Sequence, residues 1–299
     1  METKSLLELS EEFRKGLINR RAFLQKVVLS AGGVVAAGHL LHKLGFDQEL
    51  IGEARADGSP IQEMDVTYPS EDGDVNAFLA RPAQGGPFPT MIVIHEIFGL
   101  SEFVKEVARL FARTGYLALA PALPEGGGTL PDGKHSQWML DTLKTGVAVV
   151  PDDEQDKLRA GFIYLSQRED VDATHIGSVG FCWGGARSFT FATLNPDLWA
   201  AVVFYGSTPP FQDLDNIQAP VLGLYGALDN ASPTSITGRA AETAREMRDR
   251  GKVFEWEVYN RAAHGFFRGD PEHIAETRPA LLAKDLMFDF LDRHYGDTT

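Results

Sequence analysis

Cysteine is almost absent from this chain. Among its 299 residues there is a single cysteine, Cys182. One thiol excludes an intrachain disulfide and any zinc site built from several cysteines. A lone cysteine usually packs as a small buried hydrophobic residue, so a functional role for Cys182 needs support from its neighbours.

Positive charge is also scarce. The chain has 28 Lys and Arg against 42 Asp and Glu, which gives a formal net charge of −14. This balance excludes a generally basic nucleic-acid-binding surface, and we expect no nucleic-acid partner. Hydrophobic residues make up 43% and charged residues 23% of the chain, as in ordinary globular proteins.

The apolar stretch at residues 27–41 is too short to cross a membrane. As a helix rising roughly 1.5 Å per residue it would not span a hydrocarbon core of about 30 Å. The stretch follows a basic segment, an arrangement that is typical of the apolar region of an export signal.

Arg20 and Arg21, just before Phe23, resemble the twin-arginine export signal, which the twin-arginine translocase reads. Ala54-Arg55-Ala56 offers a cleavage site, so we expect residues 1–56 to be a signal or N-terminal extension and the protein to be periplasmic or otherwise exported. The alternative is that this segment, with a helix over residues 6–17, docks on the remaining domain of a cytoplasmic protein.

From residue 57 to 299 the sequence predicts one domain in which strands and helices alternate. Such an order predicts an α/β fold with a mostly parallel central sheet and helices on both faces. The first two strands have no helix between them and are expected to form an antiparallel edge. Functional groups of such sheets gather at the carboxyl ends of the strands. The expected strands are 64–68, 75–80, 90–95, 116–120, 176–181, 200–204, 221–225 and 253–259, and the expected helices are 101–114, 155–167, 184–194, 235–250 and 279–294.

One strand-to-helix turn carries the strongest functional pattern. Gly180-x-Cys182-x-Gly184 has the form of a nucleophile elbow, with cysteine where serine is common. The glycines suit a sharp turn in which a side chain would collide with the neighbouring strand or helix. The elbow also places the thiol at a helix N-terminus, which favours the thiolate. The pattern therefore makes Cys182 a candidate nucleophile.

Candidate partners of the thiol follow in the order nucleophile, acid, histidine. Asp229 lies in the turn after the strand at 221–225, and His264 follows the last strand. His264 would exchange protons with the thiol and the leaving group, while Asp229 would fix its tautomer and orientation. Taken singly, Asp229 is also suited to a turn, and His264 to an ordinary loop.

An acyl-transfer site also needs donors for the developing oxyanion. The candidates are the backbone N–H groups of Trp183, directly after the nucleophile, and of Ile97, after an early strand. His95 and Glu96 are adjacent, but two ligands without a third do not make a metal site, and we expect no metal and no other cofactor.

Three segments together resemble the dienelactone hydrolase family, the carboxymethylenebutenolidases. These segments are residues 95–100, 180–185 and 263–266, and the resemblance extends over roughly residues 60–297. It implies an α/β-hydrolase fold, a Cys-His-Asp triad, no cofactor, and control of the resting cysteine by Glu96. It also implies that Arg268 binds a substrate carboxylate, although Arg268 could instead pair with a surface acid such as Asp270 or Glu272.

This sequence departs from the family pattern in two places. A second family arginine, near residues 134–138, has no clear counterpart, and Lys134 could replace it only as a point charge. The strand-end segment 121–124 is also altered, and a glycine-rich loop follows it at 125–128. These departures concern the substrate more than the reaction.

The sequence therefore predicts a monomeric hydrolase of small lactones or activated esters that acts through a cysteine nucleophile and a thioester. The first alternative is a general carboxylesterase or thioesterase that uses the same residues on uncharged acyl substrates. The second is a catalytically silent binding protein of the same fold, although a silent protein has no physical need of all three triad groups.

Overall fold

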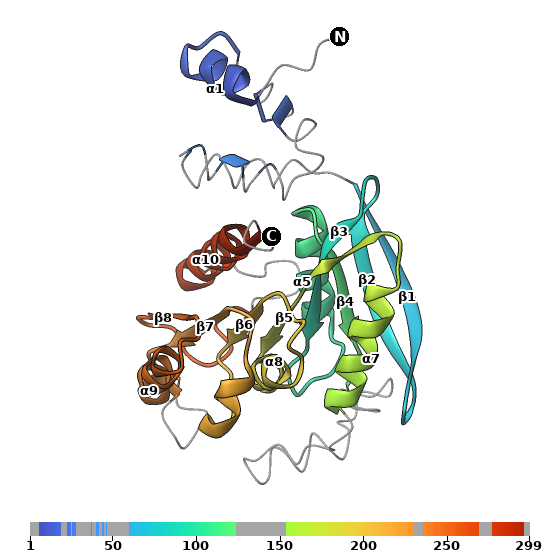
Figure 1. Cartoon of the computed structure of the whole chain (residues 1–299), viewed down its shortest axis with the longest axis vertical. Coiled ribbons are helices and arrows are strands. Elements are labelled where there is room, and N and C mark those ends of the chain that lie inside the picture. Colours follow the sequence, from blue (N-terminus) through green and yellow to red (C-terminus); the bar gives the residue numbers. More distant parts are fainter. Residues whose placement is uncertain are drawn as a thin grey trace.

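Eight strands form one sheet in the order β1-β2-β4-β3-β5-β6-β7-β8 in the computed structural model of the chain (Figure 1). The structure describes residues 6–18, scattered positions from 23 to 46, and residues 60–123, 154–229, 236–268 and 277–295. The strands are β1 (Ile61–Ser70), β2 (Gly73–Pro82), β3 (Phe88–Ile94), β4 (Leu117–Pro121), β5 (Val171–Phe181), β6 (Ala201–Phe204), β7 (Val221–Gly226) and β8 (Phe254–Tyr259).

The pairing of the strands confirms the predicted topology. β1 pairs with β2, and β2 with β4, in antiparallel register, whereas all pairs from β4 to β8 are parallel. A short turn joins β1 to β2, so these strands can only run in opposite directions. Most later strands are joined through helices, which return the chain in the same direction.

Helices cover both faces of the sheet, as predicted (Figure 1). The principal helices are α5 (Glu102–Arg113), α7 (Glu154–Ser166), α8 (Trp183–Leu194), α9 (Ile236–Asp249) and α10 (Arg278–Tyr295), and a short 3₁₀ helix, η1 (Phe211–Asn216), precedes β7. Buried side chains of α5 and α10 share one apolar cluster, and those of α7, α8 and α9 share the other. Successive strand residues alternate between the clusters, so Val93 joins the first and Ile94 the second.

The N-terminal segment contains the predicted helix, α1 (Leu6–Arg14), and has an apolar cluster of its own. The rings of Phe13 and Phe23 stack with centroids 4.5 Å apart, and Arg14 donates a hydrogen bond of 2.9 Å to the Leu44 carbonyl. The buried members of the cluster are Leu9, Phe23, Leu24, Val27, Ala37 and Leu41.

Arg20, Arg21 and the expected cleavage site at 54–56 lie outside the described residues, so export stays a prediction. None of the helices in the described ranges combines the length and apolar character that a bilayer-spanning helix needs.

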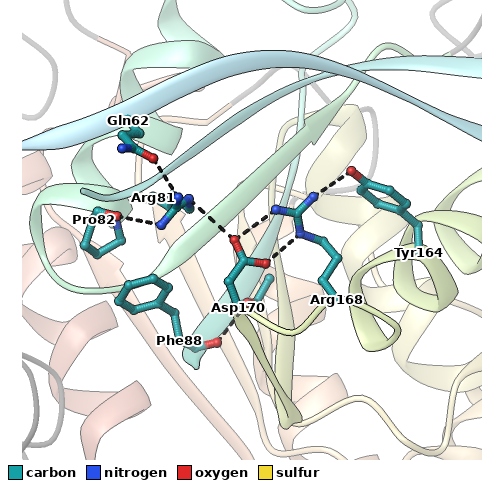
Figure 2. A network of polar contacts seen from close by, with 8 residues as sticks. Gln62, Arg81, Pro82, Phe88, Tyr164, Arg168 and Asp170 are labelled. Atoms are coloured by element: carbon teal, nitrogen blue, oxygen red, sulfur yellow. Dashed lines mark hydrogen bonds and ion pairs between the residues drawn. The ribbon is translucent and has the colours of Figure 1, made fainter. Parts of the chain in front are cut away.

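A polar network ties the antiparallel edge to the start of β5 (Figure 2). Asp170 lies between two guanidinium groups: it accepts hydrogen bonds of 2.8 and 2.9 Å from Arg168, and Arg81 of β2 approaches it at 3.4 Å. Arg168 also donates to the Tyr164 hydroxyl on α7, and Arg81 donates to Gln62 of β1. One carboxylate thus connects β1, β2, α7 and β5.

Asp170→Ala is expected to lower the free energy of unfolding by about 1.5–3 kcal/mol, because it leaves two half-buried arginines without their shared acceptor. Burial alone would raise the pKa of Asp170, but the hydrogen bonds from Arg168 and the charge of Arg81 outweigh it and lower the pKa. The stabilisation is therefore complete above the ordinary aspartate pKa and is lost as the pH falls through the depressed one. Denaturant melts at neutral and acid pH measure this. An equal loss of stability at every pH would contradict the role of the charge.

Candidate active site

Cys182 lies at the sharp turn between β5 and α8. Its backbone has φ 56° and ψ −116°, a left-handed conformation that residues other than glycine seldom adopt. A Cβ atom at Gly180 would come within 1.9 Å of the Gly184 carbonyl oxygen, and one at Gly184 within 2.3 Å of the His95 carbonyl oxygen. Both glycines are thus required for close backbone approach, as the elbow pattern predicts.

The turn presents the thiol at the N-terminus of α8 and leaves it partly accessible. The backbone N–H of Cys182 donates to the Phe204 carbonyl at 3.0 Å, which fixes the turn against β6. Cys182 is partly buried and contacts both apolar clusters. The helix N-terminus provides partial positive charge beside the sulfur.

The turn after β7 and the loop after β8 bring Asp229 and His264 together. The Nδ1 atom of His264 lies 2.8 Å from Oδ2 of Asp229. The Asp229 side chain is fully buried, whereas that of His264 is 28% exposed. Leu228 N–H donates to the Ala262 carbonyl at 2.8 Å, so the backbone itself links the two loops.

His264 also interacts with Cys182, so the imidazole lies between the carboxylate and the thiol. Burial alone would lower the pKa of His264, but hydrogen bonds with Asp229 and Cys182 and the charges of both raise it to about 10. A protonated imidazole and a nearby thiolate stabilise each other as an ion pair, which is why a neighbouring negative charge raises a histidine pKa. The three predicted triad residues therefore meet in one place, with the geometry of a nucleophile, a base and an orienting acid.

His95, which closes β3, fixes the predicted oxyanion loop. Its Nε2 accepts a 2.8 Å hydrogen bond from the Leu123 N–H, so the proton resides on Nδ1, which lies 2.5 Å from the Glu96 carbonyl oxygen and donates to it. Burial lowers the pKa of His95 to about 4, so the ring is neutral. Both ring nitrogens are committed to the backbone, which excludes His95 as a metal ligand. Within the described ranges no three His, Cys, Asp or Glu residues are grouped as metal ligands.

The same ring supports the second predicted oxyanion donor. The imidazole of His95 stacks on the indole of Trp183, with centroids 5.4 Å apart, and the Arg187 guanidinium covers the Trp183 ring at 5.1 Å. Trp183 is the first residue of α8, and Ile97 is in the loop that follows His95. The two backbone segments that would hold an oxyanion are therefore coupled through one stacked pair of rings.

Glu96 and Arg268 form an ion pair at the edge of the site. Arg268 Nη1 is 3.3 Å from Glu96 Oε2, and the guanidinium also lies over the Phe98 ring at 4.4 Å. Glu96 is almost fully buried, and burial raises the pKa of its carboxyl, although the charges of Arg268 and His264 act in the opposite direction. The structure pairs Glu96 with Arg268. The contact between Glu96 and the resting cysteine that the resemblance implies stays a prediction.

Four features predicted from the sequence lie outside the described residues: Lys134, the glycine-rich loop at 125–128, and the surface acids Asp270 and Glu272. Sequence reasoning missed Tyr205, which directly follows β6 and whose ring meets that of His264 with centroids 5.1 Å apart. Its position at the carboxyl end of a parallel strand was the available signal.

Comparisons with known proteins point to one family. A sequence profile described as "Dienelactone hydrolase family" matches residues 75–295. A "Putative carboxymethylenebutenolidase" of Methylorubrum extorquens is 36% identical over 231 residues, which cover 74% of this chain and 75% of that protein. A protein of the same description from Yersinia pestis is 34% identical over 248 residues, which cover 77% of this chain and 88% of that protein.

Solved structures are similar over the same region. A crystal structure named "Putative Dienelactone Hydrolase" from Klebsiella pneumoniae has a TM-score of 0.67 and 30% identity, and the match covers 78% of this chain and 99% of that one. An esterase from Pyrobaculum calidifontis has a TM-score of 0.57 with 16% identity, covering 86% of this chain and 96% of that one, which shows a shared fold. The predicted α/β-hydrolase fold is thus confirmed.

Proposed function

Because the chain belongs to the dienelactone hydrolase family, we propose that it hydrolyses small lactones or activated esters with Cys182 as the nucleophile. The observation that carries the proposal is the position of His264, 2.8 Å from Asp229 and in hydrogen-bond contact with Cys182. A cysteine on a strained turn at a helix N-terminus, beside a histidine oriented by a carboxylate, is the arrangement that nucleophilic acyl transfer requires.

The reaction then proceeds in two halves. The Cys182 thiolate attacks the carbonyl carbon, and the backbone N–H groups of Ile97 and Trp183 hold the resulting oxyanion. The C–O bond breaks as His264 gives its proton to the leaving oxygen, which leaves a thioester on Cys182. Water then attacks the thioester while His264 takes one of its protons, and the thiol is released with the acid. No cofactor takes part in these steps.

Arg268 favours substrates that carry a carboxylate. Its side chain is 40% exposed and is already held next to Glu96 and Phe98, so a ligand carboxylate can reach it from solvent. The planar fork of arginine can donate two parallel hydrogen bonds to such a group. A substrate carboxylate would then compete with Glu96 for Arg268 and leave Glu96 beside the triad.

Arg268→Met is expected to lower kcat/KM roughly 10- to 150-fold for a lactone that carries a carboxylate, the loss typical of one charge-assisted hydrogen bond. A neutral ester of the same size should lose far less. Arg248→Met on the exposed face of α9 is the matched control and should behave as wild type. Equal losses on both substrates would mean that Arg268 supports the loop instead of reading the carboxylate.

The general esterase and the silent binding protein make different predictions in the same assays. A panel of enol-lactones, p-nitrophenyl esters and thioesters separates them. Preference for neutral esters and indifference to Arg268→Met would favour the general esterase. Substrate binding without any turnover would favour the binding protein.

We further propose that the protein is exported through the twin-arginine translocase, on the pattern at Arg20 and Arg21. Changing both to lysine should retain the protein in the cytoplasm, since the receptor reads the arginine pair. Cell fractionation measures this. Equal export of the Arg and Lys forms would exclude this route and leave the catalytic proposal unaffected.

A further inference from the structure

The backbone of Tyr205 is strained in a way that places its ring in the site. Tyr205 has φ 41°, which is a rare conformation for a bulky aromatic residue. Its N–H donates to the Leu224 carbonyl at 2.8 Å, and the next residue, Gly206, lies so close to α8 that a Cβ there would be 2.3 Å from the Ala186 nitrogen. Close packing of β6 against α8 and β7 therefore enforces a backbone strain of the kind that gathers at functional sites.

The Tyr205 hydroxyl is buried and has no hydrogen-bond partner within the described part of the chain. The whole residue is 1% exposed. A buried donor without a partner costs about 1–3 kcal/mol, so such groups are rare unless a ligand meets them. Burial, reinforced by the negative charges of Glu96 and Cys182, raises the pKa of Tyr205 well above its ordinary value, so the hydroxyl keeps its proton.

The side of the site on which Tyr205 lies follows from its ring contacts. Its ring meets the His264 ring edge-on, with centroids 5.1 Å apart and planes inclined by 61°. The oxyanion donors Ile97 and Trp183 come from a different loop and from the start of α8, whereas His264 serves the oxygen that departs. The Tyr205 ring therefore lies on the His264 side of the site, which is the side of the leaving oxygen.

We propose that Tyr205 is a catalytic residue of this hydrolase: its hydroxyl donates a hydrogen bond to the leaving-group oxygen of the ester bound at Cys182. The inference rests on the proposed function. In the acylation step the S–C bond forms and the C–O bond breaks, while the proton that reaches the leaving oxygen comes from His264. Tyr205 transfers no proton; its hydrogen bond stabilises the negative charge that grows on that oxygen in the transition state.

The test is the leaving-group dependence of kcat/KM in Tyr205→Phe. For acetate esters of p-nitrophenol, phenol and trifluoroethanol the acyl group is constant and the leaving group becomes progressively poorer. The variant should hydrolyse the p-nitrophenyl ester within about threefold of wild type but lose roughly 10- to 150-fold on the trifluoroethyl ester, because the poorest leaving group carries the most charge. Iodoacetamide should alkylate Cys182 in Tyr205→Phe at the same rate as in wild type.

Tyr259→Phe is the matched control. The Tyr259 hydroxyl is likewise buried without a partner among the described residues, and its ring also contacts Phe266, at 5.4 Å, but the charges that act on it are Glu257 and Asp285 rather than those of the site. This control should show the wild-type dependence on the leaving group. Tyr205→Phe keeps the ring and removes only a hydroxyl that has no partner in the described ranges, so its melting temperature should be equal to or above that of wild type.

Equal losses of Tyr205→Phe on all three esters would overturn the proposal and leave Tyr205 a packing role. No loss on any ester would overturn it as well. Failure of the proposed function would look different. Either wild type would hydrolyse none of the three esters, or the Cys182→Ala variant would hydrolyse them as well as wild type does.

Discussion

Replacing Cys182 with alanine is expected to lower kcat roughly 10⁴-fold or more while the fold is retained. The variant has no atom that can form the thioester, so the two-step route is closed, and only oxyanion binding and proximity remain. Alanine keeps the Cβ atom and therefore the same backbone strain at φ 56°. Steady-state hydrolysis of a p-nitrophenyl ester gives the loss, and thermal unfolding shows whether the domain is intact.

Cys182→Ser is the informative companion variant. It keeps the elbow and a nucleophilic oxygen but lacks a readily formed anion, so partial activity is expected. Wild-type turnover by the alanine variant would exclude Cys182 as nucleophile whatever the serine variant does.

Asp229→Asn is expected to lower kcat/KM by roughly 10²–10⁴-fold, because the buried carboxylate orients the imidazole and stabilises its charged form. Without the hydrogen bond to Asp229 the pKa of His264, about 10 in the native chain, should fall. A less basic imidazole stabilises the thiolate less. The pH at which iodoacetamide alkylation of Cys182 is half-maximal should therefore rise, and the single cysteine makes this readout free of background.

The same substitution has a pH-dependent effect on stability. His264 has a raised pKa in the folded state, so its contribution to the free energy of unfolding is complete below pH 6.5 and is lost as the pH rises through about 10. The destabilisation of Asp229→Asn should shrink over that interval. Asp249→Asn, at the exposed end of α9, is the control. An unchanged alkylation profile in Asp229→Asn would separate Asp229 from the thiol.

The sequence predicts the fold well because its local patterns and the global topology agree. Apolar runs such as residues 90–95 and 221–225 form strands. The glycines at 180 and 184 predict that backbone segments approach each other closely, and in the structure neither position has room for a Cβ atom. The positions of Cys182, Asp229 and His264, each after a parallel strand, were sufficient to predict that they lie close together, since the carboxyl ends of parallel strands meet at one edge of the sheet.

What the sequence did not give are contacts between side chains far apart in the chain. Nothing in the sequence indicates that Glu96 pairs with Arg268, or that both ring nitrogens of His95 serve the backbone. Tyr205 looks like one more aromatic residue at the end of a core strand. Its positive φ and its buried hydroxyl, which has no partner among the described residues, distinguish it, and both depend on packing against α8 and β7.

The central claim is that an acyl group passes through Cys182. Acid quenching during turnover of a slow ester, followed by mass spectrometry of the peptides, tests it directly. We predict one acyl group, located on the peptide that contains Cys182, removed by neutral hydroxylamine as a thioester is, and absent from Cys182→Ala. An acyl group on any other residue would contradict the account. So would the absence of any acyl group when a burst of product release shows that an intermediate accumulates.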